Sequence, residues 1–244
     1  MTNPWTGFKE LVLVEKAPVC PGITSFYFKS KDGEKLIKHT PGQFLPFKLK
    51  TNDAKYKDAI RTYSLSMFPN EYTYRISVKK IDGGLISTYL HENLNIGDSI
   101  EAMIPTGLFT VKNKSTDIVL ISGGIGITPL LSILYDEASS RNNIHFIQAV
   151  QNSAVHPFKS DIESLVKLRG IKNTVFYSSP LANDKEGVDY DFTGYISKDY
   201  IKNNVNLDAD FYICGPPPFM KIVETHLLDL GVDKNRIYYE LFSN

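Results

Sequence analysis

The sequence predicts two domains, an N-terminal antiparallel β-barrel followed by a C-terminal α/β domain built on a parallel sheet. Up to about residue 111, short strand-like segments are separated by turn formers such as Pro41-Gly42 and Gly97-Asp98. From about residue 113, continuous apolar runs alternate with helix-like segments, which is typical of a parallel sheet covered by helices. We expect the boundary at the polar connector 112–116, which gives domains of residues 1–112 and 113–244.

In the first half, three segments have the composition of strands and one has the pattern of a helix. Residues 23–28 are rich in β-branched and aromatic side chains, and residues 43–49 and 72–78 alternate with the period of a half-buried strand. Residues 85–93 place three apolar side chains on one helical face. Several short strands with one helix favour a small barrel.

In the second half, strand and helix patterns follow one another in regular order. The apolar run 118–121 predicts a buried parallel strand, and Pro129 stands at an early position of the helix after it. We expect Ser197 to cap a short helix and Gly231 to end the last one. The other predicted elements are strands at 146–150, 174–178, 211–214 and 236–242, and helices at 158–168, 197–203 and 219–230.

Composition excludes several classes of protein. The 27 basic and 27 acidic residues are interspersed, so no basic surface for nucleic acid is expected. The first residues lack a signal-peptide pattern and no apolar run is long enough to cross a bilayer, so we expect a cytoplasmic protein without a membrane span. Cys20 and Cys214 are too few for an iron–sulfur cluster, and the five histidines lack metal-ligand spacing, so no metal is expected.

A glycine-rich turn between an apolar strand and a helix start occupies residues 122–129 (sequence SGGIGITP). Glycines allow close approach to a ligand, and the N-terminus of the following helix attracts an anion such as a pyrophosphate. However, the Gly-x-Gly-x-x-Gly fingerprint is absent, and the next strand runs into residues 151–153 (QNS) without a ribose-binding carboxylate. A turn that needs glycine only for packing remains the alternative.

The segment 61–66 (RTYSLS) combines a fixed positive charge, a phenol and hydroxyl groups in a β-type context. Arg61 can bind a phosphate, Tyr63 can pack on a flat heterocycle, and Ser64 can hydrogen-bond to a ring nitrogen. In a strand Ser64 points away from the face of Arg61 and Tyr63, so a bulge or a strand end is needed to bring Tyr63 and Ser64 to one ligand. A surface arginine beside a core tyrosine is the alternative.

Taken in order along nearly the whole chain, the motifs resemble the ferredoxin–NADP reductase superfamily, and within it the reductase portion of flavohaemoglobins. No globin or [2Fe–2S] domain is recognised beside them. The motifs that carry the resemblance are PGQF (41–44), RTYSL (61–65), YRISVK (74–79), GGLIS (83–87), PTGLF (105–109), GGIGITP (123–129), YICGP (212–216) and YELF (239–242).

For the barrel, the resemblance implies bound FAD, with FMN less expected. Arg61 would hold a flavin phosphate, Tyr63 would pack on the isoalloxazine, and Ser64 would reach the flavin N5 edge. The helix start at Gly84–Ser87 would receive the pyrophosphate, whereas Lys79 could lie near the flavin tail or be solvated. The cofactor-binding residues expected here are Arg61, Tyr63, Ser64, Leu65, Val78, Lys79, Gly83, Gly84 and Ser87.

For the C-terminal half, the resemblance implies a site for the nicotinamide dinucleotide. Cys214 would lie beside the nicotinamide, Glu240 near the flavin edge, and Phe242 over the second flavin face. From the residues alone, Cys214 could equally be an inert buried thiol, Glu240 an exposed strand residue and Phe242 part of the core. The expected dinucleotide- and cofactor-binding residues are Gly124, Gly126, Thr128, Cys214, Gly215, Pro216 and Phe242, and the expected catalytic residues are Ser64, Cys214, Glu240 and Phe242.

The implied reaction is hydride transfer from NAD(P)H to the flavin, followed by electron delivery to a separate acceptor. NADH is favoured over NADPH because residues 178–180 (SSP) lack an arginine to read a 2′-phosphate, although Ser178, Ser179 and Lys185 could form a weaker phosphate site. The expected acceptor is a ferredoxin, a flavodoxin, an oxygenase component or a small oxidant, and the expected state is a monomer or small oligomer. A diaphorase, an electron-transfer subunit of a larger complex, and a non-catalytic nucleotide-binding module are the alternatives.

Overall fold

The computed structural model describes residues 5–57, 59–140 and 143–242. By its internal contacts the chain divides into two compact units. The first extends to Thr110 and includes residues 131–133, and the second comprises residues 111–130 and those from 134 onward. Each unit has its own six-stranded sheet, and each is described by itself.

The first unit is an antiparallel sheet that closes on itself. Its strands lie in the order β4-β3-β6-β1-β2-β5, so that β4 and β5 are the two ends of the ladder. A bridge between Leu65 and Ile76 joins these ends, and Ser66 N–H donates to the Arg75 carbonyl beside it. The predicted barrel is therefore confirmed. Its elements are β1 (Lys9–Cys20), β2 (Ile23–Ser30), β3 (Phe44–Leu49), β4 (Arg61–Ser64), β5 (Tyr74–Lys79), α1 (Leu85–Glu92) and β6 (Ser99–Ala102).

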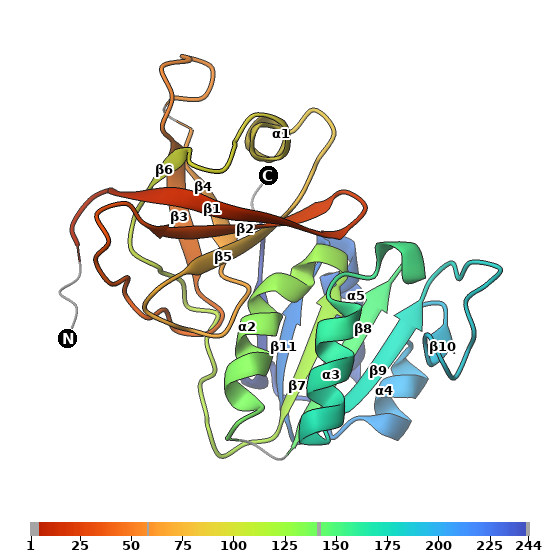
Figure 1. Cartoon of the computed structure of the whole chain (residues 1–244). Helices are drawn as coiled ribbons and strands as arrows, with labels where there is room; N and C mark the ends of the chain where they lie inside the picture. Colours follow the sequence, from red (N-terminus) through yellow and green to blue (C-terminus); the bar gives the residue numbers. More distant parts are fainter. Residues whose placement is uncertain (1–4, 58, 141–142, 243–244) are drawn as a thin grey trace. The chain divides into compact units, whose positions relative to one another are not determined.

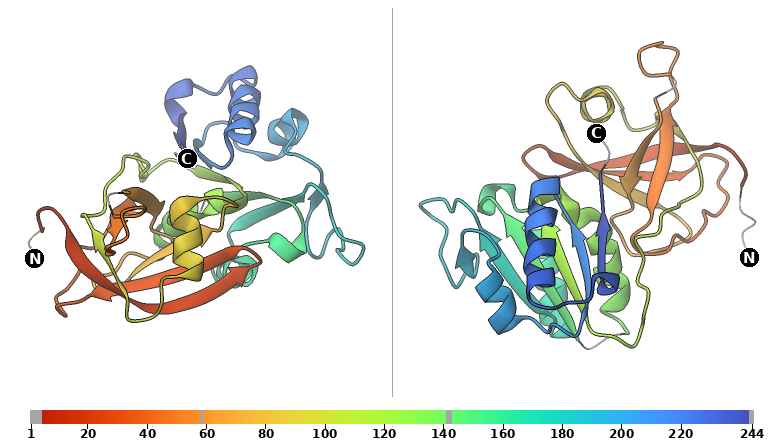
Figure 2. Two further views of the ribbon diagram at one scale, coloured as in Figure 1. Left: turned by 90° about the horizontal axis from the view of Figure 1, so that it is seen from above. Right: turned by 180° about the vertical axis from the view of Figure 1, so that it is seen from behind.

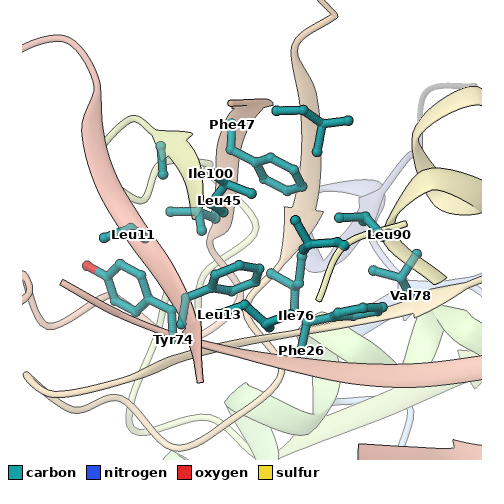
Figure 3. Close-up of a cluster of buried hydrophobic side chains, with 14 of the residues drawn as sticks. Leu11, Leu13, Phe26, Leu45, Phe47, Tyr74, Ile76, Val78, Leu90 and Ile100 are labelled. Carbon is teal, nitrogen blue, oxygen red and sulfur yellow. The ribbon is translucent and has the colours of Figure 1, made fainter. Parts of the chain in front are cut away.

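The interior of the barrel is filled by buried apolar side chains from β1, β2, β3, β5 and β6 and from α1, and Tyr63 of β4 packs against them. Leu13, Phe26 and Phe47 point into it, and Leu90 of α1 joins them (Figure 3). Tyr74 lies at its edge, where its hydroxyl donates to the Ile37 carbonyl at 2.5 Å. Burying each of these side chains contributes about 1.5–3 kcal/mol, so the closed barrel is a stable support for groups on its strand ends.

The longest strand, β1, is not predicted by the sequence analysis. Its pairing with β2 shifts register between Leu13 and Glu15 and again between Pro18 and Cys20. Each irregularity interrupts the alternation of inward and outward side chains, and Pro18 lies inside the strand. The sequence of β1 therefore lacks the continuous period-two pattern by which a strand is recognised.

The second unit is a parallel sheet with helices on both faces. Its strand order is β10-β9-β8-β7-β11-β12, and α2 and α3 lie on one face while α4 and α5 lie on the other (Figures 1 and 2). This confirms the predicted fold class. Its elements are β7 (Ile118–Gly123), η1 (Gly124–Gly126), α2 (Ile127–Glu137), β8 (Ile144–Val150), η2 (Ser153–Val155), α3 (Lys159–Arg169), β9 (Lys172–Tyr177), β10 (Phe192–Thr193), α4 (Lys198–Asn204), β11 (Asp210–Cys214), α5 (Pro217–Asp229), η3 (Lys234–Arg236) and β12 (Ile237–Glu240).

Local signals set the ends of two helices as the sequence predicts. Ser197 Oγ accepts a hydrogen bond from Tyr200 N at 3.1 Å and so caps α4. Gly231 follows α5 with φ of +86°, a conformation that few other residues adopt. The last strand is shorter at both ends than the predicted 236–242, since β12 comprises only Ile237–Glu240.

Two further properties concern the described residues only. Within these ranges no helix is both long and apolar enough to cross a membrane. Over the same ranges no three histidine, cysteine, aspartate or glutamate side chains gather into a group that could hold a metal ion.

Candidate functional site

In the first unit, the expected flavin residues lie where β4 changes its pairing partner. Ser64 is the last residue of β4 and pairs with Phe44 of β3, whereas the next residue, Leu65, bridges to Ile76 of β5. The chain thus leaves one end of the ladder and joins the other at Ser64. This is the strand end that the sequence analysis requires if Tyr63 and Ser64 are to serve one ligand.

Tyr63 and Arg61 occupy the same face of β4. The Tyr63 ring stacks on Phe47, with ring centroids 5.7 Å apart and planes inclined by 26°. Burial raises the pKa of the Tyr63 phenol to about 12, with a smaller opposite effect from Arg61, so the phenol is neutral at pH 7. Arg61 donates from Nη1 to the Ile60 carbonyl at 2.9 Å, and a guanidinium has further donors to offer a phosphate.

The N-terminus of α1 begins at Gly84 without a side-chain cap. Ser87 Oγ instead accepts from Ile81 N at 3.2 Å, and Gly84 N donates to the Ile81 carbonyl at 2.9 Å, so the turn before the helix is closed on itself. A Cβ at Gly84 would lie 2.6 Å from Ser87 Oγ. The main-chain N–H groups of the first helical turn are thus left for an anion, while the Ser87 hydroxyl holds the turn.

Four other expected barrel residues contribute in different ways. The side chains of Leu65 and Val78 lie in the core, so only their main-chain groups could contact a cofactor. The Val78 carbonyl faces His91 Nε2 at 2.9 Å. Lys79 is exposed at the end of β5, and Gly83 has φ of +71° in the turn before α1. Their binding roles stay predictions.

In the second unit, the expected residues meet at the point where the strand order reverses. The strands after β7 extend to one side of it, and β11 and β12 lie on the other. Ligands of such sheets bind in the crevice outside the carboxyl ends of the strands at this reversal. Gly124 and Gly126 follow β7, and Cys214 and Gly215 stand at the end of β11, so both expected loops are at the reversal.

These two loops pack directly against each other. A Cβ at Gly126 would lie 2.2 Å from the Cys214 carbonyl oxygen, and a Cβ at Gly215 would lie 3.0 Å from Gly123 Cα. Neither contact leaves space for a side chain. Gly124 has φ of +53°, and a Cβ there would meet nothing within 4 Å, so the main chain is open on that side.

The helices that follow the two loops start differently. Thr128 is buried in α2, and its hydroxyl donates to the Ile125 carbonyl at 3.1 Å, which holds the glycine turn. No side chain caps α2. Pro216 precedes α5, whose first residue is also a proline, a favourable residue at this position. Thr128 therefore shapes the turn, and the main chain is the group that an anion would meet.

Cys214 and Glu240 are direct neighbours in the parallel ladder, and Ser122 flanks Cys214 on the other side. Burial, with a smaller effect of Glu240, raises the pKa of the Cys214 thiol well above its ordinary range. Burial also raises the pKa of the Glu240 carboxyl. Cys214 is thus a neutral thiol rather than a reactive thiolate, which suits contact with an uncharged ring and not covalent catalysis.

Phe242 lies two residues beyond the end of β12 and is 40% exposed. The alternative that it fills the core of its unit does not fit this exposure. Its expected place over a flavin stays a prediction.

Two aromatic residues adjoin the expected site residues although the sequence analysis assigned them no role. Phe44 pairs with Ser64 across β3 and β4. Phe219 of α5 lies against both loops of the second unit, because Cβ atoms at Gly123 and Gly215 would meet its ring at 2.9 and 2.7 Å. Phe44 ends a motif that carried the resemblance. For Phe219 the sequence shows only an aromatic residue in the first turn of a predicted helix, a pattern too common to indicate a site.

Two domain models match the chain in this order. The model "Oxidoreductase FAD-binding domain" matches residues 10–111, and "Oxidoreductase NAD-binding domain" matches residues 120–225. The first contains the β4 and α1 groups described above, and the second contains the glycine turn and Cys214.

Two known proteins are similar to this chain over nearly its whole length. The chain is 39% identical to a flavohemoprotein of Rhizobium meliloti and 38% identical to one of Bacillus subtilis, over 98% of this chain in both cases. It spans 61% and 60% of these two proteins, so it corresponds to about three fifths of each.

Solved structures extend the comparison to the fold. The flavohem-like FAD/NAD-binding domain of nitric oxide dioxygenase from Vibrio cholerae superposes with a TM-score of 0.88 at 32% identity, covering 98% of this chain and 100% of that one. The cytochrome b5 reductase domain of Ulva prolifera nitrate reductase shares the fold, with a TM-score of 0.82, 22% identity and 98% coverage of both chains.

The residues present fit the two groups that these domains bind. The first unit has groups suited to FAD, namely an arginine and an uncapped helix N-terminus for its phosphates and a neutral tyrosine for its ring. A dinucleotide suits two loops that lack side chains at their contact and leave the main chain accessible.

Proposed function

Because the chain belongs to the ferredoxin–NADP reductase family and is an FAD-dependent NAD(P)H reductase, we propose that it oxidises NADH in preference to NADPH and delivers the electrons to an acceptor outside these 244 residues. The observation that carries this proposal is the register of Cys214 with Glu240 beside the glycine turn. This register supports a dinucleotide site in which a neutral thiol lies where the strand order reverses, between β7 and β12.

When bound, FAD supplies the capacity to accept a hydride and to release electrons. The protein contributes binding and orientation. Arg61 and the first turn of α1 bind the phosphates of the cofactor, and Tyr63, held flat by Phe47, packs on its ring. Ser64 offers a hydroxyl at the strand end to the N5 edge.

In the second unit, the main chain at Gly124 and Gly126 binds the coenzyme pyrophosphate at the start of α2. Cys214 packs against the nicotinamide, and the Glu240 carboxyl lies next to the thiol. Phe242 would cover the flavin ring and move aside when the nicotinamide binds. Productive hydride transfer requires the two reacting atoms to lie about 3–3.5 Å apart. The role of these residues is therefore to position the nicotinamide and the flavin, and not to perform acid–base chemistry.

The proposal is tested by mixing the purified, FAD-supplemented protein with NADH without oxygen. We expect a yellow protein that bleaches within the mixing experiment. A parallel sample with ADP-ribose in place of NADH must keep its colour. Purified protein that accepts no flavin even with excess FAD would contradict the proposal and would favour a non-catalytic nucleotide-binding module.

The acceptor is the second part of the proposal. The relatives are named flavohemoproteins, which favours a haem protein as the acceptor. Stopped-flow reoxidation of the NADH-reduced protein by a ferric globin, a ferredoxin, a flavodoxin and a free quinone would rank the candidates. Fast reoxidation only by the quinone would indicate a diaphorase and contradict a haem acceptor.

A further inference from the structure

At the carboxyl end of β8, the second parallel strand along the chain, lies a carboxylate that belongs to a different segment of the chain. In dinucleotide-binding sheets, a carboxylate at the end of the strand after the glycine turn accepts a hydrogen bond from the adenosine ribose. Here β8 ends at Val150, and the residues that follow are Gln151, Asn152 and Ser153. None of them is acidic.

The fold brings a carboxylate to this place from the loop after β9. Asp184 Oδ1 accepts from Ser153 Oγ at 2.5 Å, and Asp184 Oδ2 faces Ser153 N at 3.3 Å. Leu181 N donates to Oδ2 as well, at 2.9 Å. The carboxylate of Asp184 therefore lies against the carboxyl end of β8.

The two loops are joined by further hydrogen bonds, so this carboxylate is fixed in position. Ser178 N donates to the Val150 carbonyl and Ser179 N to the Gln151 carbonyl, both at 2.9 Å, so the ladder extends beyond the strands. The Asn152 amide also faces the Ser179 carbonyl, at 3.4 Å. A charge held this firmly acts on a ligand without the reorganisation that a mobile side chain requires.

The Asp184 charge is not neutralised by an ion pair among the described residues, unlike the charge of its neighbour Asp189. Asp189 forms an ion pair with Lys159 at 2.8 Å, and the nearby positive charge of Lys185 also lowers the pKa of Asp189. For Asp184, partial burial opposes ionisation, but the hydrogen bonds from Ser153 and Leu181 outweigh it and lower its pKa. Asp184 is therefore a carboxylate at neutral pH.

We propose that Asp184 determines coenzyme choice in this protein by placing an unneutralised carboxylate where the adenosine ribose binds. A ribose 2′-hydroxyl can donate to a carboxylate oxygen, whereas a 2′-phosphate, with a charge of about −1.5 to −2, is repelled by it. Lys185, which the sequence analysis considered as a phosphate ligand, lies close enough to Asp189 to help lower the pKa of that carboxyl. The inference rests on the proposed function and identifies the residue behind its preference for NADH.

The test measures binding without turnover, by titration calorimetry with ADP-ribose and with 2′-phospho-ADP-ribose. For the wild type we expect tighter binding of ADP-ribose. Asp184→Asn removes the charge and keeps an acceptor oxygen, and we expect it to reduce the preference about tenfold, mostly by tighter binding of the 2′-phosphorylated ligand.

Two further variants separate charge from loop structure. Asp208→Asn makes the same charge change on the exposed loop before β11, at the amino ends of the parallel strands and not at the carboxyl ends where Asp184 lies, and should leave the preference unchanged. Ser153→Ala removes one hydrogen bond to Asp184 and keeps its charge, so it should weaken both ligands alike. The wild-type preference should also shrink as salt is added, because salt screens charges and not shapes.

The outcomes are distinct. An unchanged preference in folded Asp184→Asn overturns the assignment while leaving the proposed function intact. A preference that falls equally in Ser153→Ala, or that resists salt, shows that loop shape is responsible and also overturns it. Failure of the wild type to bind either ligand contradicts the proposed function itself.

Discussion

In both units we propose that the uncapped N-terminus of a helix binds an anion, but the turn before the helix is fixed differently in each. In the first unit, the turn before α1 is closed by Ser87, and three carbonyls at the other end of the helix accept hydrogen bonds from Lys16 Nζ. In the second, the chain runs from β7 through η1 into α2 without a cap, and the turn is fixed by the contact between Gly126 and the Cys214 carbonyl.

The difference extends to the ligand groups. The barrel offers side chains on a strand, Arg61, Tyr63 and Ser64, each with a defined direction. The parallel sheet offers main chain at glycine turns, with few side chains to order. We infer that side-chain recognition suits a cofactor that stays bound, and that main-chain recognition suits a coenzyme that must leave after each turnover. The following predictions test this division, beginning with the largest expected effect.

Replacing Gly126 by alanine should disable the coenzyme site and spare the flavin site. The new Cβ would lie 2.2 Å from the Cys214 carbonyl, so the two loops must separate. Because a displacement of about 1 Å can reduce rates by about a hundredfold, we expect kcat/KM for NADH to fall at least about a hundredfold. Flavin content per protein should not change.

The control for this variant is Gly97→Ala in the barrel. Gly97 also has a positive φ, of 97°, but a Cβ there meets nothing within 4 Å. It should cost some stability and leave NADH kinetics unaffected. Equal loss of flavin and coenzyme binding in Gly126→Ala would show that the two sites do not separate.

Acid should act on a buried network of the second unit. His156 lies between the Tyr177 hydroxyl and Gln148 Oε1, each at 3.0 Å, and burial, with a smaller effect of Lys159, lowers its pKa to about 4. An unfolded histidine has a pKa of about 6.5, so the stabilisation is complete above that pH and is lost as pH falls toward about 4. Urea titrations should show roughly 2 kcal/mol less stability at pH 5 than at pH 8 from this group.

His156→Gln should flatten this pH dependence, although His145, whose pKa is also lowered to about 4 by burial, will retain part of it. The barrel offers a matched non-titrating network, in which the hydroxyls of Ser25 and Ser66 each lie 2.8 Å from that of Ser77. Ser77→Ala should therefore lower stability equally at both pH values. Parallel curves for the wild type and His156→Gln would contradict the role of His156.

Arg61→Ala should weaken flavin binding and spare the coenzyme. A charge-assisted hydrogen bond contributes about 1.5–3 kcal/mol, so we expect the Kd for FAD to rise at least about tenfold. ADP-ribose affinity, measured by calorimetry, should not change. Arg169→Ala, on the exposed end of α3, removes the same charge and is the control. Unaltered FAD affinity in Arg61→Ala would return Arg61 to the alternative of a surface arginine.

The smallest effect is expected from Lys16→Met. The Lys16 ammonium donates to the carbonyls of Leu90, His91 and Leu94 at 2.9–3.2 Å and so supports α1 from its C-terminal end. Its loss should lower the unfolding free energy by about 1 kcal/mol and loosen FAD slightly. Lys29→Met, at an exposed position of β2, serves as the comparison. Equal melting temperatures for the two variants would exclude this role.

Sequence patterns predicted elements well where their signals are local. The apolar run of β7, the Ser197 cap and Gly231 depend on neighbours within a few residues, and the structure confirms all three. β1 was missed because register shifts against β2 and the proline within it obscure its period. The predicted last strand, 236–242, begins one residue before β12 and ends two residues after it. A register shift is a property of a strand pair, so one strand cannot reveal it.

The sequence by itself determined the two-domain class, the two nucleotide motifs and their order, because turn chemistry and hydrophobic period are written in consecutive residues. Only the tertiary structure placed Cys214 against Glu240, packed Gly126 on the Cys214 carbonyl and brought Asp184 to the end of β8. Each of these contacts joins residues far apart along the chain. They arise from parallel strand order and loop packing, which no local pattern encodes.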